Sequence, residues 1–186
     1  MVAVKKITEK NTFTYTDYAQ WETDDRYELI DGVPYAMGSP TTRHQRIIGE
    51  LFVRLHDFLK GKSCEVFISP LDVRLNYDTK DDTVVQPDIM VICDKNKIDD
   101  KSIKGAPDLV VEILSPSNKR FDFLVKHDKY FEAGIPEYWI VDPIENIVHV
   151  FILKDGNYIA KVYGDTDTLP SHILDGCNIN LKEIFG

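Results

Sequence analysis

Residues 107–114 read Pro-Asp-Leu-Val-Val-Glu-Ile-Leu, an apolar run that a single acid, Glu112, interrupts near its end. Such a run predicts a β-strand over Asp108–Leu114 that is covered on both faces. A helix is predicted to follow over Lys119–Ala133, and a second apolar strand over Glu137–Asp142. This strand–helix–strand unit is the part of the sequence that decides the fold.

Outward from this unit, the chain carries two hairpins and one long helix. Asp31-Gly32 and Asp155-Gly156 each separate two apolar runs, which is a strong hairpin signal. Apolar residues recur every three or four positions over Thr42–Leu59, the period of an amphipathic helix. Residues Val84–Cys93 read as one strand. The order of these elements predicts a mixed α+β fold and not an alternating βαβ repeat.

The composition fits one globular domain. The chain has 186 residues, 43% of them hydrophobic, which is enough to build a core. We expect a flexible N-terminal segment over residues 1–12 and a single domain over 13–186. No stretch approaches the roughly 18–20 apolar residues of a membrane span, so no membrane contact is expected. The N-terminal residues contain no apolar block of signal-peptide length, so we expect no export.

Charge and cysteine content narrow the function further. A net charge of −9 argues against coating of nucleic acid by bulk charge. Residues 43–62 nevertheless hold five basic residues against two acids, which leaves local DNA contact open.

Cys64, Cys93 and Cys177 are odd in number and widely spaced, so we expect neither a disulfide framework nor a metal-binding pair. A cytoplasmic location follows.

Two of the thirty-one acids stand inside apolar strands. Asp88 lies in the Val84–Cys93 run and Glu112 in the Asp108–Leu114 run. An unpaired buried carboxylate is costly, so such groups are usually paired, neutralised or bound to metal. If the two strands pair, both acids can face one side and share a hard divalent ion. The alternative is a hydrogen bond at a strand end or an arginine partner. Glu28 is a third candidate, or an ordinary cross-strand acid.

Together these segments resemble the Uma family of restriction endonuclease-like proteins, within the PD-(D/E)xK nuclease superfamily. The similarity covers about residues 12–185, and its most specific part is Glu-Ile-Leu-Ser-Pro-Ser followed by Gly-Ile-Pro-Glu-Tyr-Trp. The residues that carry it are Tyr27–Gly32, His44, Gln86–Asp88, Pro107–Ser117, Asp122, Lys126, Tyr130 and Gly134–Asp142.

The resemblance implies a restriction-endonuclease-like core. This is a central mixed β-sheet flanked by helices in αβββαβ order, here with added N- and C-terminal β-hairpins. It also implies hydrolysis of DNA phosphodiester bonds that depends on Mg²⁺ or Mn²⁺. Asp88 and Glu112 would take the two acid positions of the motif and bind the metal. By analogy, the carbonyl oxygen of Ile113 would be a further metal ligand.

The chain departs from the superfamily motif at one position. The motif expects a lysine two residues after Glu112, where this chain has Leu114. The family resemblance points to Lys126, on the following helix, as the catalytic lysine. The alternative is a surface ion pair between Lys126 and Asp122, which are four residues apart. A helical wheel favours this alternative, because Lys126 lies nearly opposite an apolar stripe. That stripe consists of Phe121, Leu124, Val125 and Phe131.

His44 stands near the start of the predicted helix over Thr42–Leu59. It could contact the scissile phosphate or assist proton transfer. The alternative is a helix-capping or core histidine. Glu28 would join the acids from the edge of the first hairpin.

Two other functions compete with that of a DNA nuclease. Leu114 and the net charge of −9 favour a catalytically inactive relative that binds nucleic acid or protein. A glycosidase would need two acids about 5–10 Å apart around a sugar groove. The exposed apolar strands and the C-terminal hairpin could also form a homodimer interface.

Overall fold

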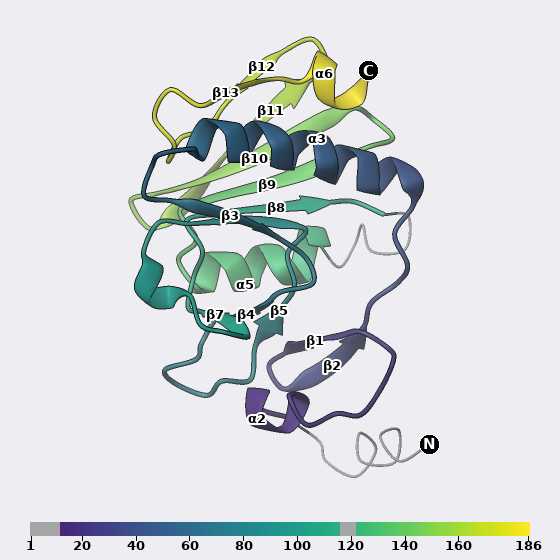
Figure 1. Ribbon diagram of the computed structural model, residues 1–186, viewed down its shortest axis with the longest axis vertical. Helices are drawn as coiled ribbons and strands as arrows, with labels where there is room; N and C mark the ends of the chain where they lie inside the picture. The colour runs from purple at the N-terminus through teal and green to yellow at the C-terminus, as the bar shows by residue number, and fades with distance from the viewer. Residues whose placement is uncertain (1–11, 116–121) are drawn as a thin grey trace.

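The computed structural model describes residues 12–115 and 122–186, and its centre is a six-stranded mixed sheet (Figure 1). The strand order is β11-β10-β9-β8-β6-β3, with β8 and β9 parallel and the other neighbours antiparallel. The strands are β3 (Glu65–Ile68), β6 (Ile89–Ile92), β8 (Leu109–Ile113), β9 (Glu137–Asp142), β10 (Ile147–Lys154) and β11 (Asn157–Gly164).

Helices cover both faces of this sheet (Figure 1). Helix α3 (Thr42–Leu59) packs on one face, and α5 (His127–Glu132) packs on the other. A π-helical segment, η2 (Asp122–Lys126), leads directly into α5. The order α3-β3-β6-β8-α5-β9 is the αβββαβ order that the resemblance implies, so the predicted fold class is confirmed. The predicted start of the second helix, at Lys119, lies outside the described residues.

Smaller elements flank the central sheet. A five-stranded sheet has the order β2-β1-β5-β4-β7 and contains the predicted N-terminal hairpin. Its strands are β1 (Tyr27–Ile30), β2 (Val33–Ala36), β4 (Asp72–Arg74), β5 (Val84–Val85) and β7 (Ser102–Lys104). The remaining elements are α2 (Tyr15–Tyr18), η1 (Lys95–Lys97), the β12 (Thr168–Pro170) and β13 (Asn178–Asn180) pair, and α6 (Lys182–Phe185).

Side-chain alternation along β8 explains how an acid enters an apolar core. Leu109, Val111 and Ile113 pack toward α3, whereas Val110 and Leu114 belong to the cluster under α5. Because successive side chains of a strand point to opposite faces, Glu112 points to the α5 side. The apolar run therefore fills both cores and directs one carboxylate toward the helix that follows it.

The prediction of one strand over Val84–Cys93 is wrong. The run contains two strands, β5 in the five-stranded sheet and β6 in the central sheet. Pro87 lies between them and has no N–H to donate to a ladder, so it marks the change of sheet. The bend places Asp88 at the entrance to β6 and not inside a strand.

The expectation that the cysteines form no disulfide is also wrong, because Cys64 and Cys93 are bonded. Strands β3 and β6 pair antiparallel with Glu65 opposite Ile92, so the two flanking cysteines face each other. A separation of 29 residues in sequence hides this pairing. Cys177 is free and buried, and burial raises the pKa of its thiol to about 11. The cysteine argument for a cytoplasmic location therefore no longer holds.

Two further expectations are a flexible N-terminus and the absence of a membrane span. The predicted flexible segment 1–12 lies outside the described residues except for its last member. Across residues 12–115 and 122–186, no helix combines the length and the apolar character needed to cross a membrane.

Glu137 is a fully buried carboxylate that ties the C-terminal segment to the central sheet. Its Oε2 accepts hydrogen bonds from Ser171 Oγ (2.8 Å) and from the backbone N–H groups of His172 (2.8 Å) and Ile173 (2.9 Å). Its Oε1 accepts one from Trp139 Nε1 (2.8 Å). We expect Glu137→Gln to lower the free energy of unfolding by about 2–4 kcal/mol, because an amide N–H₂ would face buried donors.

Urea denaturation of wild type and Glu137→Gln measures this effect. Glu145→Gln is the matched control, since Glu145 is exposed and accepts no side-chain hydrogen bond within the described residues. The control should stay within about 0.5 kcal/mol of wild type. Equal stability of both variants would show that Glu137 does not hold the C-terminal segment.

Candidate active site

Pairing of β6 with β8 brings the two predicted acids to the same place. Ile89 lies opposite Val111, and one step further along the ladder Asp88 comes level with Glu112. Asp88 Oδ2 accepts a hydrogen bond from the backbone N–H of Ile113 at 2.8 Å. The two carboxylates therefore meet at one end of the β6–β8 ladder, as the sequence predicts, and line one cleft.

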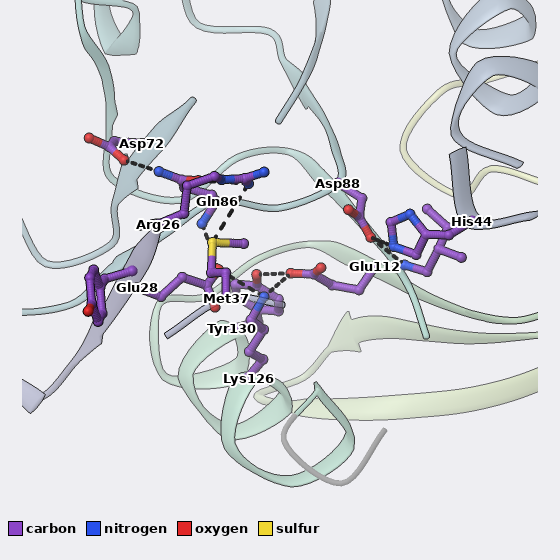
Figure 2. A network of polar contacts seen from close by, with 12 residues as sticks. Arg26, Glu28, Met37, His44, Asp72, Gln86, Asp88, Glu112, Lys126 and Tyr130 are labelled. Carbon is purple, nitrogen blue, oxygen red and sulfur yellow. Dashed lines mark hydrogen bonds and ion pairs between the residues drawn. The ribbon is translucent and has the colours of Figure 1, made fainter. Parts of the chain in front are cut away.

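Lys126 joins these acids from the helix that covers the sheet (Figure 2). Its Nζ lies 2.9 Å from Glu112 Oε1 and 2.9 Å from Glu28 Oε1, and the residue is only 3% exposed. Tyr130, one helical turn further on, donates from its hydroxyl to Glu112 Oε1 at 2.6 Å. Glu28 Oε1 also accepts the backbone N–H of Gln86 at 2.8 Å. One ammonium thus bridges carboxylates from two different sheets.

The interpretation of Lys126 as a surface residue is wrong. Two residues of the apolar stripe that suggested it are exposed, Leu124 at 55% and Phe131 at 38%, whereas Val125 packs against the core. A wheel drawn at the α-helical period fails here because η2 is a π-helix, which has more residues per turn. Leu114, at the motif lysine position, is buried in the apolar cluster under α5. The side chain of Asp122 lies outside the described part of the chain.

His44 contacts Asp88 from the first turn of α3. Its Nε2 lies 3.1 Å from Asp88 Oδ2, and the residue is buried. The helix is capped by Thr41, whose side-chain oxygen accepts the backbone N–H of His44 at 3.2 Å. Thr41, and not the imidazole, therefore caps the helix, and the buried ring of His44 lines the cleft beside Asp88.

The cleft is lined by six separate segments of the chain. It has a volume of about 50 Å³, room for a few water molecules or an ion. Its lining residues are Arg26, Met37, Gly38, Ser39, Pro40, His44, Gln45, Ser69, Gln86, Asp88, Glu112, Ile113, Ser115 and Lys126. Glu28 lies behind this lining, where it contacts Lys126.

Burial and charge keep the tyrosine of this cluster protonated. The pKa of Tyr130 is raised well above its usual range, first by burial and then by the negative charges of Glu112 and Glu28. Its hydroxyl therefore remains a hydrogen-bond donor at neutral and alkaline pH. A fixed donor on Oε1 holds the carboxylate of Glu112 in one orientation.

The charge balance of the cluster suits a divalent cation. Glu28, Asp88 and Glu112 against the cationic groups of Lys126 and Arg26 leave a formal charge of −1 around the cleft. Within the described residues, Asp88 Oδ1 receives no hydrogen bond. Two carboxylates and the carbonyl oxygen of Ile113 form an oxygen donor set of the kind that Mg²⁺ prefers when water and phosphate complete the coordination.

The residues present therefore fit the implied metal ion, for which the protein would supply only a few ligands. Over the described ranges, no group of three or more His, Cys, Asp and Glu side chains is gathered as a metal cage. Mg²⁺ keeps several waters and takes one or two carboxylates, which matches a donor set of Asp88 and Glu112.

Sequence reasoning gave no catalytic or binding role to three further residues of the site. Tyr130 entered only through the resemblance, although its spacing of four from Lys126 is a usable signal. The buried side chain of Gln86 accepts Arg26 Nε (3.2 Å) and Nη2 (2.9 Å) and donates to Asp72 Oδ1 (2.9 Å). Burial raises the pKa of Asp72. No sequence pattern points to Arg26, because it lies in a polar segment just before β1.

Comparison with known proteins bears on the domain as a whole. Residues 15–182 match the model of a protein family, Uma2, described as "Putative restriction endonuclease". An uncharacterized protein of Synechocystis sp., slr1290, is 35% identical over 157 residues, which are 82% of this chain and 81% of that protein. The crystal structure of a "putative nuclease belonging to DUF820" from Anabaena variabilis superposes with a TM-score of 0.75 at 21% identity. That likeness covers 93% of this chain and 97% of the other, and it shows a shared fold.

Proposed function

Because the chain belongs to the Uma2 family, we propose that it is a nuclease that hydrolyses DNA phosphodiester bonds with Mg²⁺ or Mn²⁺. One observation carries this proposal. The buried ammonium of Lys126 contacts Glu112 at 2.9 Å in a cleft that Asp88 also lines. This arrangement supports the assignment of Asp88, Glu112 and Lys126 as the acid, acid and lysine of the PD-(D/E)xK motif, with the lysine supplied by the helix instead of the strand.

In this proposal the two acids hold the cation. Asp88, Glu112 and the carbonyl oxygen of Ile113 would be its protein ligands. When bound, the cation supplies Lewis-acid chemistry that polarises a phosphoryl oxygen and makes water a stronger nucleophile near neutral pH. Tyr130 donates a hydrogen bond to Oε1 of Glu112 and so fixes the orientation of the carboxylate group.

Lys126 and His44 provide the cationic and proton-carrying groups. Lys126, fixed by Glu28 and Glu112, would orient the attacking water and offset the charge that develops on the phosphate. His44 is positioned by Asp88 and would contact the scissile phosphate or carry a proton. Glu28 acts on the reaction only through Lys126, so it is a positioning residue.

The two competing functions lose support from the geometry. Leu114 favoured an inactive relative because it stands where the motif has a lysine. Lys126 brings an ammonium group to Glu112 from the helix instead. A glycosidase needs a groove that holds a sugar between two acids. A cavity of about 50 Å³ gives that alternative no support.

Cleavage assays with Asp88→Asn test the proposal. Wild type should cut plasmid, linear duplex or single-stranded DNA with Mg²⁺ or Mn²⁺ and stop when EDTA is added. Asp88→Asn should lose about 100-fold or more in rate, because the amide cannot supply the negative charge for the cation. The melting temperature, measured alongside, should change little, since an amide oxygen can still accept from Ile113 N–H.

Asp165→Asn is the matched control, because it makes the same charge change at an exposed residue that does not line the cleft. Its rate should equal that of wild type. A wild-type protein that leaves all three substrates intact with either metal would contradict the proposal, as would full activity in Asp88→Asn.

A further inference from the structure

A second pocket adjoins the proposed catalytic cleft. It has a volume of about 250 Å³, several times the roughly 30 Å³ share of one water molecule. Its lining residues are Tyr18, Ala19, Trp21, Thr23, Asp25, Arg26, Tyr27 and Gln86. Arg26 and Gln86 line the cleft as well, so the two spaces share a wall. Neither residue has a role in the chemistry proposed above.

Three aromatic side chains form the apolar part of this second pocket, and their packing fixes them in place. Trp21 makes edge-to-face contacts with Tyr18 and Tyr27, with ring centroids 5.3 and 5.6 Å apart. The hydroxyl of Tyr18 donates to Asp72 Oδ1 at 3.1 Å and accepts from Gln86 Nε2 at 3.1 Å. All three rings are only partly buried. The pocket is therefore preformed and presents aromatic surface.

Arg26 places a positive charge at the shared wall. A neutral partner, Gln86, holds its guanidinium in a bidentate contact at 3.2 and 2.9 Å (Figure 2). Arg26 is exposed and forms no ion pair with any residue in the described ranges. A planar guanidinium with remaining N–H donors matches the geometry of a phosphate.

We propose that this pocket binds one nucleobase of the strand being cut, while Arg26 binds the phosphodiester between that base and the cleft. The inference rests on the proposed nuclease function and names its substrate class. A base inside a duplex is stacked and paired and cannot enter such a pocket. The substrate is therefore single-stranded DNA or DNA with a locally unpaired base.

The polar lining agrees with a base as the occupant. Asp25 lies on the pocket wall, so this side of the pocket carries a carboxylate. A phosphate would be repelled there, whereas the amino group of a base finds an acceptor. Phosphate is favoured only on the Arg26 side, which faces the cleft. The charges therefore set a direction, with the base in the pocket and the backbone at the shared wall.

Tryptophan fluorescence can detect this binding without cleavage. Of the two tryptophans, Trp139 is fully buried and Trp21 lies in the pocket. In EDTA, a short single-stranded oligonucleotide should quench the fluorescence of Trp21. A blunt duplex of the same sequence should quench much less at the same concentration. Trp21→Phe should remove the signal but keep most of the affinity, because phenylalanine also stacks on a base.

Affinity, measured by anisotropy of a labelled single strand, supplies the second readout. Trp21→Leu should weaken binding on the order of 10-fold, as expected for loss of one stacked base. Arg26→Gln should weaken it to a similar degree and reduce its salt dependence. Tyr77→Leu removes an exposed aromatic side chain that lies outside the pocket and should bind like wild type. Melting temperatures identify any variant that fails to fold.

The outcomes separate this inference from the proposed function. Wild-type affinity in a folded Trp21→Leu, or duplex binding tighter than single-strand binding, would overturn the pocket assignment. If DNA is cleaved at the same rate by Trp21→Leu and wild type, the pocket assignment fails and the nuclease proposal stands. If binding depends on Trp21 but no substrate is cut, the pocket assignment stands and the nuclease proposal fails.

Discussion

Glu112→Gln is expected to reduce metal-dependent DNA cleavage about 1000-fold, a loss of about 4 kcal/mol of transition-state stabilisation. The substitution removes the charge that would hold the cation and weakens the contact with Lys126, now 2.9 Å from Oε1. The neutral side chain keeps the same shape and can still accept from Tyr130. Initial rates at saturating Mn²⁺, with the melting temperature of each protein, measure the effect.

Glu132→Gln is the control for this experiment. Glu132 lies on the same helix as Tyr130, its side chain is 62% exposed, and it forms an ion pair with Lys129. The control should cut DNA at the wild-type rate. A Glu112→Gln protein that folds and cleaves within about threefold of wild type would exclude Glu112 from the chemistry.

Lys126→Met is expected to have two large effects, on cleavage and on stability. Cleavage should fall at least 100-fold, because the ammonium that lies 2.9 Å from Glu112 Oε1 is lost. The free energy of unfolding should fall by about 3–5 kcal/mol, because Glu28 and Glu112 are left buried without their shared cation. Denaturant titrations and cleavage rates measure the two effects separately.

A double variant distinguishes catalysis from stability. Lys126→Met combined with Glu28→Gln removes one buried charge of each sign, so much of the lost stability should return while cleavage stays low. Lys129→Met is the matched control, since the partners of Lys129, Asp31 and Glu132, are mostly exposed. Its stability should change by about 1 kcal/mol or less. Recovery of cleavage in the double variant would contradict a catalytic role for Lys126.

The sequence predicts those parts of the fold in which local pattern and tertiary packing agree. The helix over Thr42–Leu59 is found with the predicted bounds, because its apolar face is regular and Thr41 caps it. Both Asp-Gly hairpins are confirmed for the same reason. The meeting of Asp88 with Glu112 follows from strand pairing, which two neighbouring apolar runs make predictable.

Other parts depend on information that no local pattern contains. The run over Val84–Cys93 looks like one strand, and only the pairing partners show that it changes sheets at Pro87. The Cys64–Cys93 bond depends on the register of β3 against β6. Lys126 seemed exposed because the wheel assumed an α-helix where the chain forms a π-helix. Glu28, one of its carboxylate partners, comes from a segment distant in sequence.

The wall shared by the two pockets is a further feature that no local sequence pattern predicts. Arg26 stands in a polar segment with three nearby acids, which predicts a solvated loop. Its function as a phosphate contact depends on Gln86, sixty residues away, which holds the guanidinium at the cleft. The aromatic residues of α2 and β1 likewise look like ordinary core until the pocket between them is seen.

Calorimetric titration of Mn²⁺ into wild type, Glu112→Gln and Lys126→Met tests most directly whether Asp88 and Glu112 share a cation. Wild type should bind one ion, Glu112→Gln should lose that binding, and Lys126→Met should bind at least as tightly because a competing positive charge is gone. Equal weak binding by wild type and a folded Glu112→Gln would contradict the account and remove the basis for the proposed chemistry.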